Sequence, residues 1–177
     1  LLQNSASKSS LSPIIRFYTW EKSWLSLGHN QKNIPEKWWE LVNKKKLNIV
    51  KRPSGGSAVL HSGGLTYALI WPSPPRKKLE AYYQASQFLI KGFSDLGIPL
   101  QFGNQPISLN KEDCFATSTS ADLIDKEGEK RIGSAQLWHR GYLLQHGEIL
   151  ITPPKKLWIE VFGTPPPKPL KSSISRT

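Results

Sequence analysis

The sequence predicts an α+β fold with a mixed, mostly antiparallel sheet flanked by helices. Short apolar and aromatic runs typical of strands come in groups, and segments with a helical spacing of apolar residues separate these groups. Glycine-rich and proline-rich stretches divide most of the segments from one another. With 177 residues and 38% hydrophobic content, the chain is long enough to bury one core, so we expect a single domain.

The first quarter of the chain is predicted to form a lead-in, two strands and a helix. Residues 1–13 are polar and rich in serine, so we expect a flexible segment. The apolar and aromatic runs at 14–18 and 24–28 are typical of strands. Pro35 favours the first turn of a helix over 36–45, whose final lysines complement the negative end of the helix dipole. Its buried face is expected to hold Trp38, Trp39 and Val42.

The middle of the chain is predicted to add three strands and the longest helix. The strands cover 47–50, 58–61 and 65–71; glycine-rich turns separate them, and a proline-rich break ends the last one. Apolar residues recur at helical spacing over 77–96, and the glycine and proline that follow end this helix.

The last third is predicted to hold strands at 122–124, 132–138 and 142–151. An acidic glycine turn joins the first two, and a hairpin at Arg140-Gly141 joins the last two. A short helix around 157–162 follows. We therefore expect a lead-in over 1–13, one domain over 14–163, and a proline- and serine-rich, disordered tail over 164–177.

The charge and the cysteine content narrow the function classes. The formal net charge of +11 suits nucleic acid, but the basic residues are spread out without a zinc-finger, RNA-binding or basic-heptad pattern. We expect no nucleic-acid partner; an acidic protein partner suits the same charge. Cys114 is the one cysteine in the chain, and no Cys/His spacing fits a metal site, so no metal is expected.

The sequence also predicts where in the cell the protein is located. It has no apolar run of membrane-spanning length and no signal sequence, so we expect a cytoplasmic protein that does not enter the membrane. It contains no methionine, from which we expect that residues precede Leu1 in the natural protein.

The most specific stretch is the segment 51–61, Lys-Arg-Pro-Ser-Gly-Gly-Ser-Ala-Val-Leu-His. Its adjacent glycines allow a backbone to approach a ligand closely, and Arg52 offers a planar fork for a carboxylate or phosphate. It is neither a P-loop nor a dinucleotide fingerprint, because Gly-Lys-Ser/Thr and GxGxxG are absent. A plain tight turn between two strands explains the same residues, so the segment alone leaves both interpretations open.

A second candidate segment combines 128–136 with 143–150. Small residues at 133–135 interrupt an apolar strand and leave room for a ligand chain beside the sheet. The ammonium of Lys130 suits a carboxylate, a phosphate or a thiolate, although lysines near turns commonly face water. His146 fits either a ligand contact or a buried core histidine.

These segments resemble the two signatures of the biotin/lipoate A/B protein ligase family. The stretch 51–61 with Leu-Thr-Tyr at 65–67 is similar to its Arg-Arg-x-Ser/Thr-Gly-Gly-x-Ala-Val-Phe/Leu-His signature. Lys-x-x-Gly-Ser-Ala-Gln at 130–136 and Leu-Gln-His-Gly at 144–147 are similar to the second signature. The resemblance implies a fold like the catalytic domain of class II synthetases and biotin protein ligases. The Gly-Arg-Gly-Arg of biotin ligases is absent, which favours lipoate or octanoate.

The resemblance also implies the residues of the site. Cys114-Phe115 resembles the Cys-Phe segment of octanoyltransferases, in which the cysteine accepts the acyl group as a thioester and a lysine, here Lys130, assists it. A nearby ammonium favours the attacking thiolate, whereas an inert buried cysteine is the alternative. The acyl or adenylate group is expected to contact Arg52, Ser54, Gly55, Gly56, Ser57, Ala58, Val59, Leu60, His61, Gly133, Ser134, Ala135, Gln136, His146 and Gly147.

The implied activity is the transfer of an octanoyl or lipoyl group to a lysine of a lipoyl-domain protein through a thioester on Cys114. The implied donors are octanoyl-acyl carrier protein or free lipoate or octanoate, and the implied acceptors are the glycine cleavage H protein or the E2 subunits of 2-oxoacid dehydrogenases. A transferase requires no cofactor. The alternatives are a ligase that uses ATP and Mg²⁺ to form an acyl-adenylate, and a non-catalytic lipoate- or octanoate-binding module.

Chain length and departures from the pattern refine this expectation. Self-sufficient ligases of the family carry an additional C-terminal domain, and the short remainder after Ile151 favours a transferase or a ligase helped by another polypeptide. Between Cys114 and Lys130 the chain carries one extra residue, which we place in the turn at 125–128. Lys51, Ser57, Ser62 and Glu148 replace the residues typical of the family, and the last two put a metal or phosphate contact there in doubt.

Overall fold

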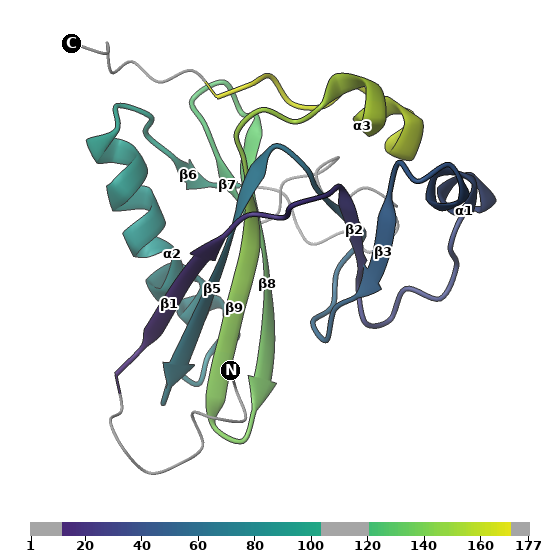
Figure 1. Ribbon diagram of the computed structural model, residues 1–177. Helices are drawn as coiled ribbons and strands as arrows, with labels where there is room; N and C mark the ends of the chain where they lie inside the picture. Colours follow the sequence, from purple (N-terminus) through teal and green to yellow (C-terminus); the bar gives the residue numbers. More distant parts are fainter. Residues whose placement is uncertain (1–11, 104–120, 171–177) are drawn as a thin grey trace.

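The computed structural model describes residues 12–103 and 121–170, which form two sheets and three helices (Figure 1). The larger sheet has six strands, and every neighbouring pair in it is antiparallel. Their order across the sheet is β1 (Ile14–Tyr18), β5 (Gly64–Pro72), β9 (Tyr142–Leu150), β8 (Lys130–His139), β7 (Leu123–Ile124) and β6 (Gln101–Phe102).

The smaller sheet has three strands, with β2 (Trp24–Leu27) between β3 (Asn48–Lys51) and β4 (Val59–His61). Strand β2 runs parallel to β3 and antiparallel to β4. The predicted α+β class with mostly antiparallel pairing is therefore confirmed.

Helix α2 (Lys78–Asp95) covers one face of the large sheet, and the small sheet lies on the other side of it (Figure 1). Side chains from α2 and the large sheet form one core cluster, with Tyr67, Leu89, Leu123, Ile132 and Ile149 among its buried members. Because side chains alternate along a strand, each large-sheet strand presents one set of residues to α2 and the other set to the small sheet.

A second core cluster joins the small sheet to the remaining helices, α1 (Glu36–Asn43) and α3 (Lys155–Phe162). Trp38 of α1 and Trp158 of α3 are both fully buried in it, and the Trp38 indole donates to the Val161 carbonyl at 2.9 Å. This packing fixes the small sheet in place. None of the helices in the described ranges combines the length and apolarity needed to cross a membrane.

Most element boundaries agree with the sequence predictions to within a few residues, including the hairpin at Arg140-Gly141. Both residues of this turn have positive φ, 47° and 82°, as the favoured two-residue turn requires. The two-residue strand β6 was not predicted, because it is too short to show any periodicity.

Three smaller predictions were wrong. Trp39 is 46% exposed and Leu41 is buried in its place, because adjacent helical residues point about 100° apart. Pro35 precedes the first helical residue instead of lying in the first turn. The stretch 164–170 is held against the domain, since the Leu170 amide donates to the Ile151 carbonyl at 2.8 Å.

Candidate active site

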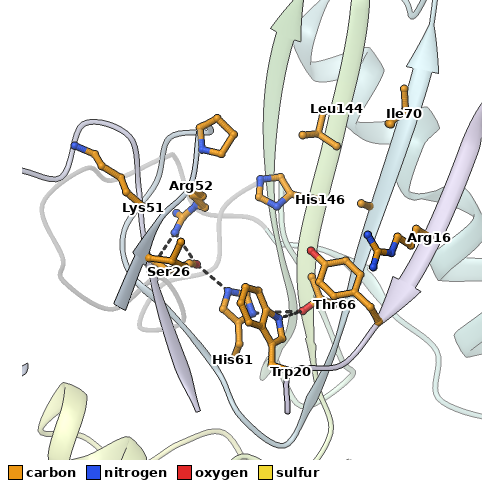
Figure 2. A pocket seen from close by; sticks show the side chains of 14 residues that line it. Arg16, Trp20, Ser26, Lys51, Arg52, His61, Thr66, Ile70, Leu144 and His146 are labelled. Carbon is orange, nitrogen blue, oxygen red and sulfur yellow. Dashed lines mark hydrogen bonds between the residues drawn. The ribbon is translucent and has the colours of Figure 1, made fainter. Parts of the chain in front are cut away.

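A cavity of about 450 Å³ lies between the two sheets. The large sheet contributes an apolar wall, with Ala68 and Ile70 from β5 and Leu144 from β9. The small sheet and its loops contribute a polar wall that includes Ser26, Arg52 and His61 (Figure 2). The cavity therefore suits a ligand with an apolar chain and a polar end.

Arg52 organises the glycine-rich loop that borders the cavity. Its Nη1 donates to the Ser26 carbonyl at 2.7 Å and to Ser26 Oγ at 3.2 Å, and its Nη2 donates to the carbonyls of Gly55 at 2.9 Å and Ser57 at 2.6 Å. These bonds use all four hydrogens on the two terminal nitrogens. In this conformation the Arg52 fork binds the loop itself, and its contact with a ligand carboxylate or phosphate stays a prediction.

Two glycines allow this loop to lie against strand β2. A Cβ on Gly28 would lie 1.7 Å from the Gly56 carbonyl oxygen, so the two backbones approach too closely for any side chain there. Gly56 has φ of +96°, a conformation that favours glycine. The close approach seen at Gly56 is therefore to Gly28 of the same chain, and the approach of this loop to a ligand stays a prediction.

The apolar half of the first signature faces away from the cavity. Ala58 and Leu60 are fully buried in the same core cluster as Trp38 and Trp158, and Val59 packs against that cluster. The side chains of these three residues therefore have a packing role. The contact with an acyl or adenylate group that the family resemblance implies would therefore be made by their backbone atoms.

The second signature is divided between the two faces of the large sheet. Ser134 Oγ lies 2.7 Å from the Tyr67 hydroxyl, and Gln136 donates to the Gln145 side chain at 2.8 Å. Gln145 in turn donates to Ser86 of α2 at 3.2 Å, which places this chain of polar groups on the α2 side. Ser134 and Gln136 therefore lie on the α2 side of the sheet, whereas Gly133 and Ala135 alternate to the cavity side. The predicted ligand contacts of these residues stay predictions.

Gly147 lets β8 and β9 come together at this point. A Cβ on Gly147 would lie 2.3 Å from the Gly133 carbonyl oxygen and 2.8 Å from the Tyr67 ring. Burial raises the pKa of Tyr67 to about 12, so its hydroxyl stays protonated and acts as a hydrogen-bonding group between the strands and α2. Gly147 thus has a packing role, and its predicted ligand contact stays a prediction.

His146 lines the cavity and is held by the glycine-rich loop. Its Nε2 lies 2.6 Å from Ser54 Oγ. Burial, and to a smaller extent the electrostatic influence of Arg52 and His61, lowers the pKa of His146 to about 4. His146 is therefore a neutral hydrogen-bonding group at neutral pH, and this joins the two predicted segments at one point.

His61 stands at the centre of a buried polar cluster on the opposite side of the cavity from the apolar wall. Its Nε2 lies 2.8 Å from Ser26 Oγ, and its Nδ1 lies 2.7 Å from Glu148 Oε2. Thr66 also donates to Glu148 at 2.5 Å, and the Trp20 indole stacks on the His61 ring with centroids 4.6 Å apart. The sequence identified His61 but not its partners, because Glu148 stood out only as a departure from the family pattern.

The family model of the lipoyl protein ligase A/B catalytic domain matches residues 1–172. The chain belongs to this family. Octanoyltransferase LipM from Halalkalibacterium halodurans is 36% identical to it over 176 residues, which cover 93% of this chain and 63% of that protein. Octanoyltransferase LipM from Bacillus subtilis is 37% identical over 157 residues, which cover 82% of this chain and 56% of that protein. The resemblance seen in the sequence is confirmed.

Solved structures of lipoate-protein ligases have the same fold. A crystal structure of lipoate-protein ligase A bound with ATP superimposes with a TM-score of 0.71 at 20% identity, covering 84% of this chain and 58% of that one. The chain spans about three fifths of the length of the LipM relatives. The length of this chain therefore does not separate a transferase from a ligase with a further domain.

Of the two predicted catalytic residues, Cys114 and Lys130, the structure describes only Lys130. Lys130, at the start of β8, is buried, and its ammonium lies 2.9 Å from the Asp122 carboxylate. Arg131 beside it pairs with Asp125 at 2.6 Å, in the turn where we placed the extra residue. Cys114 lies outside the described residues. No group of three His, Cys, Asp or Glu side chains that suits a metal ion occurs in the parts of the chain described.

Proposed function

We propose that this chain transfers an octanoyl or lipoyl group to a lysine of a lipoyl-domain protein through a thioester on Cys114. The observation that carries the proposal is the cavity between the sheets, apolar on the β5 and β9 side and polar on the side of the two family signatures. Membership of the lipoyl protein ligase A/B family and the LipM names of its relatives support the same chemistry.

The apolar wall suits the hydrocarbon part of such a group. Ala68, Ile70 and Leu144 lie side by side, because Ile70 pairs with Leu144 across the β5 and β9 ladder and Ala68 pairs with His146. Burial of a methylene on such a wall contributes about 0.8 kcal/mol. A medium-length acyl chain therefore gains several kcal/mol by lying here, with its carbonyl toward His146 and the loop.

The proposed chemistry uses Lys130 to activate Cys114. The ammonium favours the thiolate, whose sulfur attacks the carbonyl of the donor thioester. A new thioester forms on Cys114 and the donor thiol leaves with a proton. The neutral amine of the acceptor lysine then attacks, so that an amide forms and the Cys114 thiol is restored. Asp122, at 2.9 Å, holds the Lys130 ammonium in position.

The second candidate is an ATP-dependent ligase, since a solved structure with this fold is lipoate-protein ligase A bound with ATP. The hydrogen bonds that Arg52 makes to its own chain favour the transferase over this ligase. Its terminal nitrogens bind the Ser26, Gly55 and Ser57 carbonyls, and an adenylate phosphate would have to displace those bonds.

One experiment separates the candidates. The full chain is incubated with octanoyl-acyl carrier protein without ATP, and its intact mass is measured before and after addition of a lipoyl domain. We expect an octanoyl adduct that is absent in Cys114→Ser and passes to the lipoyl domain. Transfer that requires ATP and free octanoate would support the ligase instead. If neither condition gives a product, the chain is a binding module and the proposal is wrong.

A further inference from the structure

Three side chains that are distant in sequence form a linear hydrogen-bonded array beside the cavity. They are Ser26 from β2, His61 from β4 and Glu148 from β9, and all three are buried. Ser26 Oγ lies 2.8 Å from His61 Nε2, and His61 Nδ1 lies 2.7 Å from Glu148 Oε2. Ser26 and His61 also line the cavity, so the array ends at the cavity surface (Figure 2).

The chemistry of the groups fixes the direction of the hydrogen bonds. An ionised carboxylate only accepts, so Glu148 requires the hydrogen on His61 Nδ1. His61 Nε2 is then the acceptor for the Ser26 hydroxyl. Thr66 anchors Glu148 from a second direction, and Trp20 stacked on the imidazole restricts its rotation. This is the arrangement in which a histidine removes a proton from a serine while a carboxylate stabilises the resulting imidazolium.

A second serine and histidine in the same cavity provide an internal comparison. Ser54 Oγ lies 2.6 Å from His146 Nε2, a distance as suitable for proton transfer as the 2.8 Å between Ser26 Oγ and His61 Nε2. Among the residues that the structure describes, however, no carboxylate contacts His146, and its pKa of about 4 makes it a weak base. Of these two pairs, only the one with Glu148 behind the histidine has a partner for the imidazolium.

Arg52 adds a positive charge at the serine. Its Nη1 lies 3.2 Å from Ser26 Oγ and is held there by its bond to the Ser26 carbonyl. A fixed cation at this distance stabilises negative charge that develops on the serine oxygen or on a carbonyl attacked by it. The array therefore contains a nucleophile, a base, an orienting carboxylate and an electrostatic stabiliser.

We propose that Ser26 is an acyl acceptor in its own right and gives the protein hydrolase activity toward medium-chain acyl esters and thioesters. Ser26 Oγ attacks the carbonyl while His61 Nε2 takes the hydroxyl proton. The bond to the leaving alcohol or thiol breaks, and that group receives the proton from His61. Water then attacks the acyl-serine, with His61 again as base, which releases the carboxylic acid and restores Ser26. The choice of acyl chain rests on the proposed function, but the reaction does not require Cys114.

The first test needs no change to the array. The Cys114→Ala protein is treated with an alkyl fluorophosphonate, and the modified residue is located by peptide mass mapping. We expect a single adduct on Ser26, with Ser54 unmodified. An adduct on another residue, or none, overturns the proposal. Because Cys114 is absent from this protein, the outcome is independent of the thioester test described for the proposed function.

The second test measures turnover. Release of p-nitrophenolate from p-nitrophenyl octanoate is followed in the same Cys114→Ala background. We expect Ser26→Ala and His61→Ala to abolish the release, and Glu148→Gln to lower it by about 10²-fold or more. Ser62→Ala is the matched control, because Ser62 is next to His61 and its hydroxyl is 3.0 Å from Ser23 Oγ, outside the array; this variant should retain the rate. Equal release in Ser26→Ala and its parent would overturn the proposal.

Discussion

Glu148 Oε2 lies 2.7 Å from His61 Nδ1, and both side chains are buried between the two sheets. The pair joins β9 of the large sheet to β4 of the small sheet, across 87 positions of sequence. It therefore holds together the two halves of the molecule that enclose the cavity. A buried carboxylate of this kind depends on its partner, because removal of the partner leaves an uncompensated charge.

Removal of His61 should destabilise the fold strongly. We expect His61→Ala to lower the free energy of unfolding by about 3–5 kcal/mol, the usual effect of breaking a buried pair from one side. The matched control is Asp95→Asn, which removes the exposed i,i+4 pair with Lys91 at 3.3 Å and should change stability by less than about 0.5 kcal/mol. Urea unfolding followed by circular dichroism measures both. Similar losses in the two variants would show that the buried pair does not stabilise the fold.

A methyl group at Gly147 should disrupt the contact between β8 and β9. The nearest atom to its Cβ, the Gly133 carbonyl oxygen at 2.3 Å, belongs to the backbone and cannot move aside cheaply. We expect Gly147→Ala to lower the free energy of unfolding by about 1–3 kcal/mol. Gly92→Ala in α2 is the matched control, since nothing lies within 4 Å of its Cβ, and should raise stability by roughly 0.5–1 kcal/mol. A Gly147→Ala protein as stable as the parent would contradict the close strand approach.

His146 should make the fold sensitive to mild acid. Its pKa is about 4 in the folded protein and 6.5 as the ordinary value, so the unfolded chain binds the extra proton between these pH values. Stability is therefore fully present above pH 6.5 and is lost as the pH falls toward 4. This interval corresponds to roughly 3 kcal/mol, at 1.36 kcal/mol for each pH unit.

The measurement for His146 is the free energy of unfolding in urea at several pH values between 4.5 and 7.5. His146→Asn keeps a hydrogen-bonding group but does not titrate, so its stability should fall less over this range than that of the parent. The same slope in both proteins would show that His146 is not the source of the acid sensitivity.

Arg52 should be irreplaceable by lysine. A lysine keeps the charge, but it cannot bond at once to the Ser26, Gly55 and Ser57 carbonyls. We expect Arg52→Lys to speed hydrogen exchange of the Gly55 to Ser57 amides at least tenfold and to weaken octanoate binding. Arg76→Lys, at an exposed position, is the control and should leave both unchanged. Unaltered exchange in Arg52→Lys would mean that Arg52 does not hold the loop.

Lys130 should control the reactivity of Cys114 if the two act together. We expect Lys130→Gln to shift the alkylation of Cys114 by iodoacetamide to higher pH, because loss of a nearby positive charge disfavours the thiolate. Lys126→Gln removes an exposed lysine from the preceding turn and should leave the alkylation profile unchanged. The rate of alkylation is measured between pH 6 and 10. An identical profile in Lys130→Gln and the parent would show that Lys130 does not influence the Cys114 thiol.

Local patterns in the sequence determined most of the secondary structure. The apolar spacing over residues 77–96 predicted α2, and the glycine at 141 predicted the hairpin between β8 and β9. Both signals are local, because helical periodicity and positive φ depend on neighbouring residues. The same information could not choose between Trp38 and Trp39, since only the position of α1 against the small sheet decides which ring is buried.

The sequence by itself also determined the family and the two segments that border the cavity, through motifs whose residues lie close together along the chain. Only the tertiary structure decided which side chains of those segments face the cavity, which is why Ser134 and Gln136 lie on the α2 side and Arg52 binds its own loop. It also brought Ser26, His61 and Glu148 together. Such contacts depend on strand order and register, which long-range packing sets, and a change of one residue in register would turn Glu148 to the opposite face.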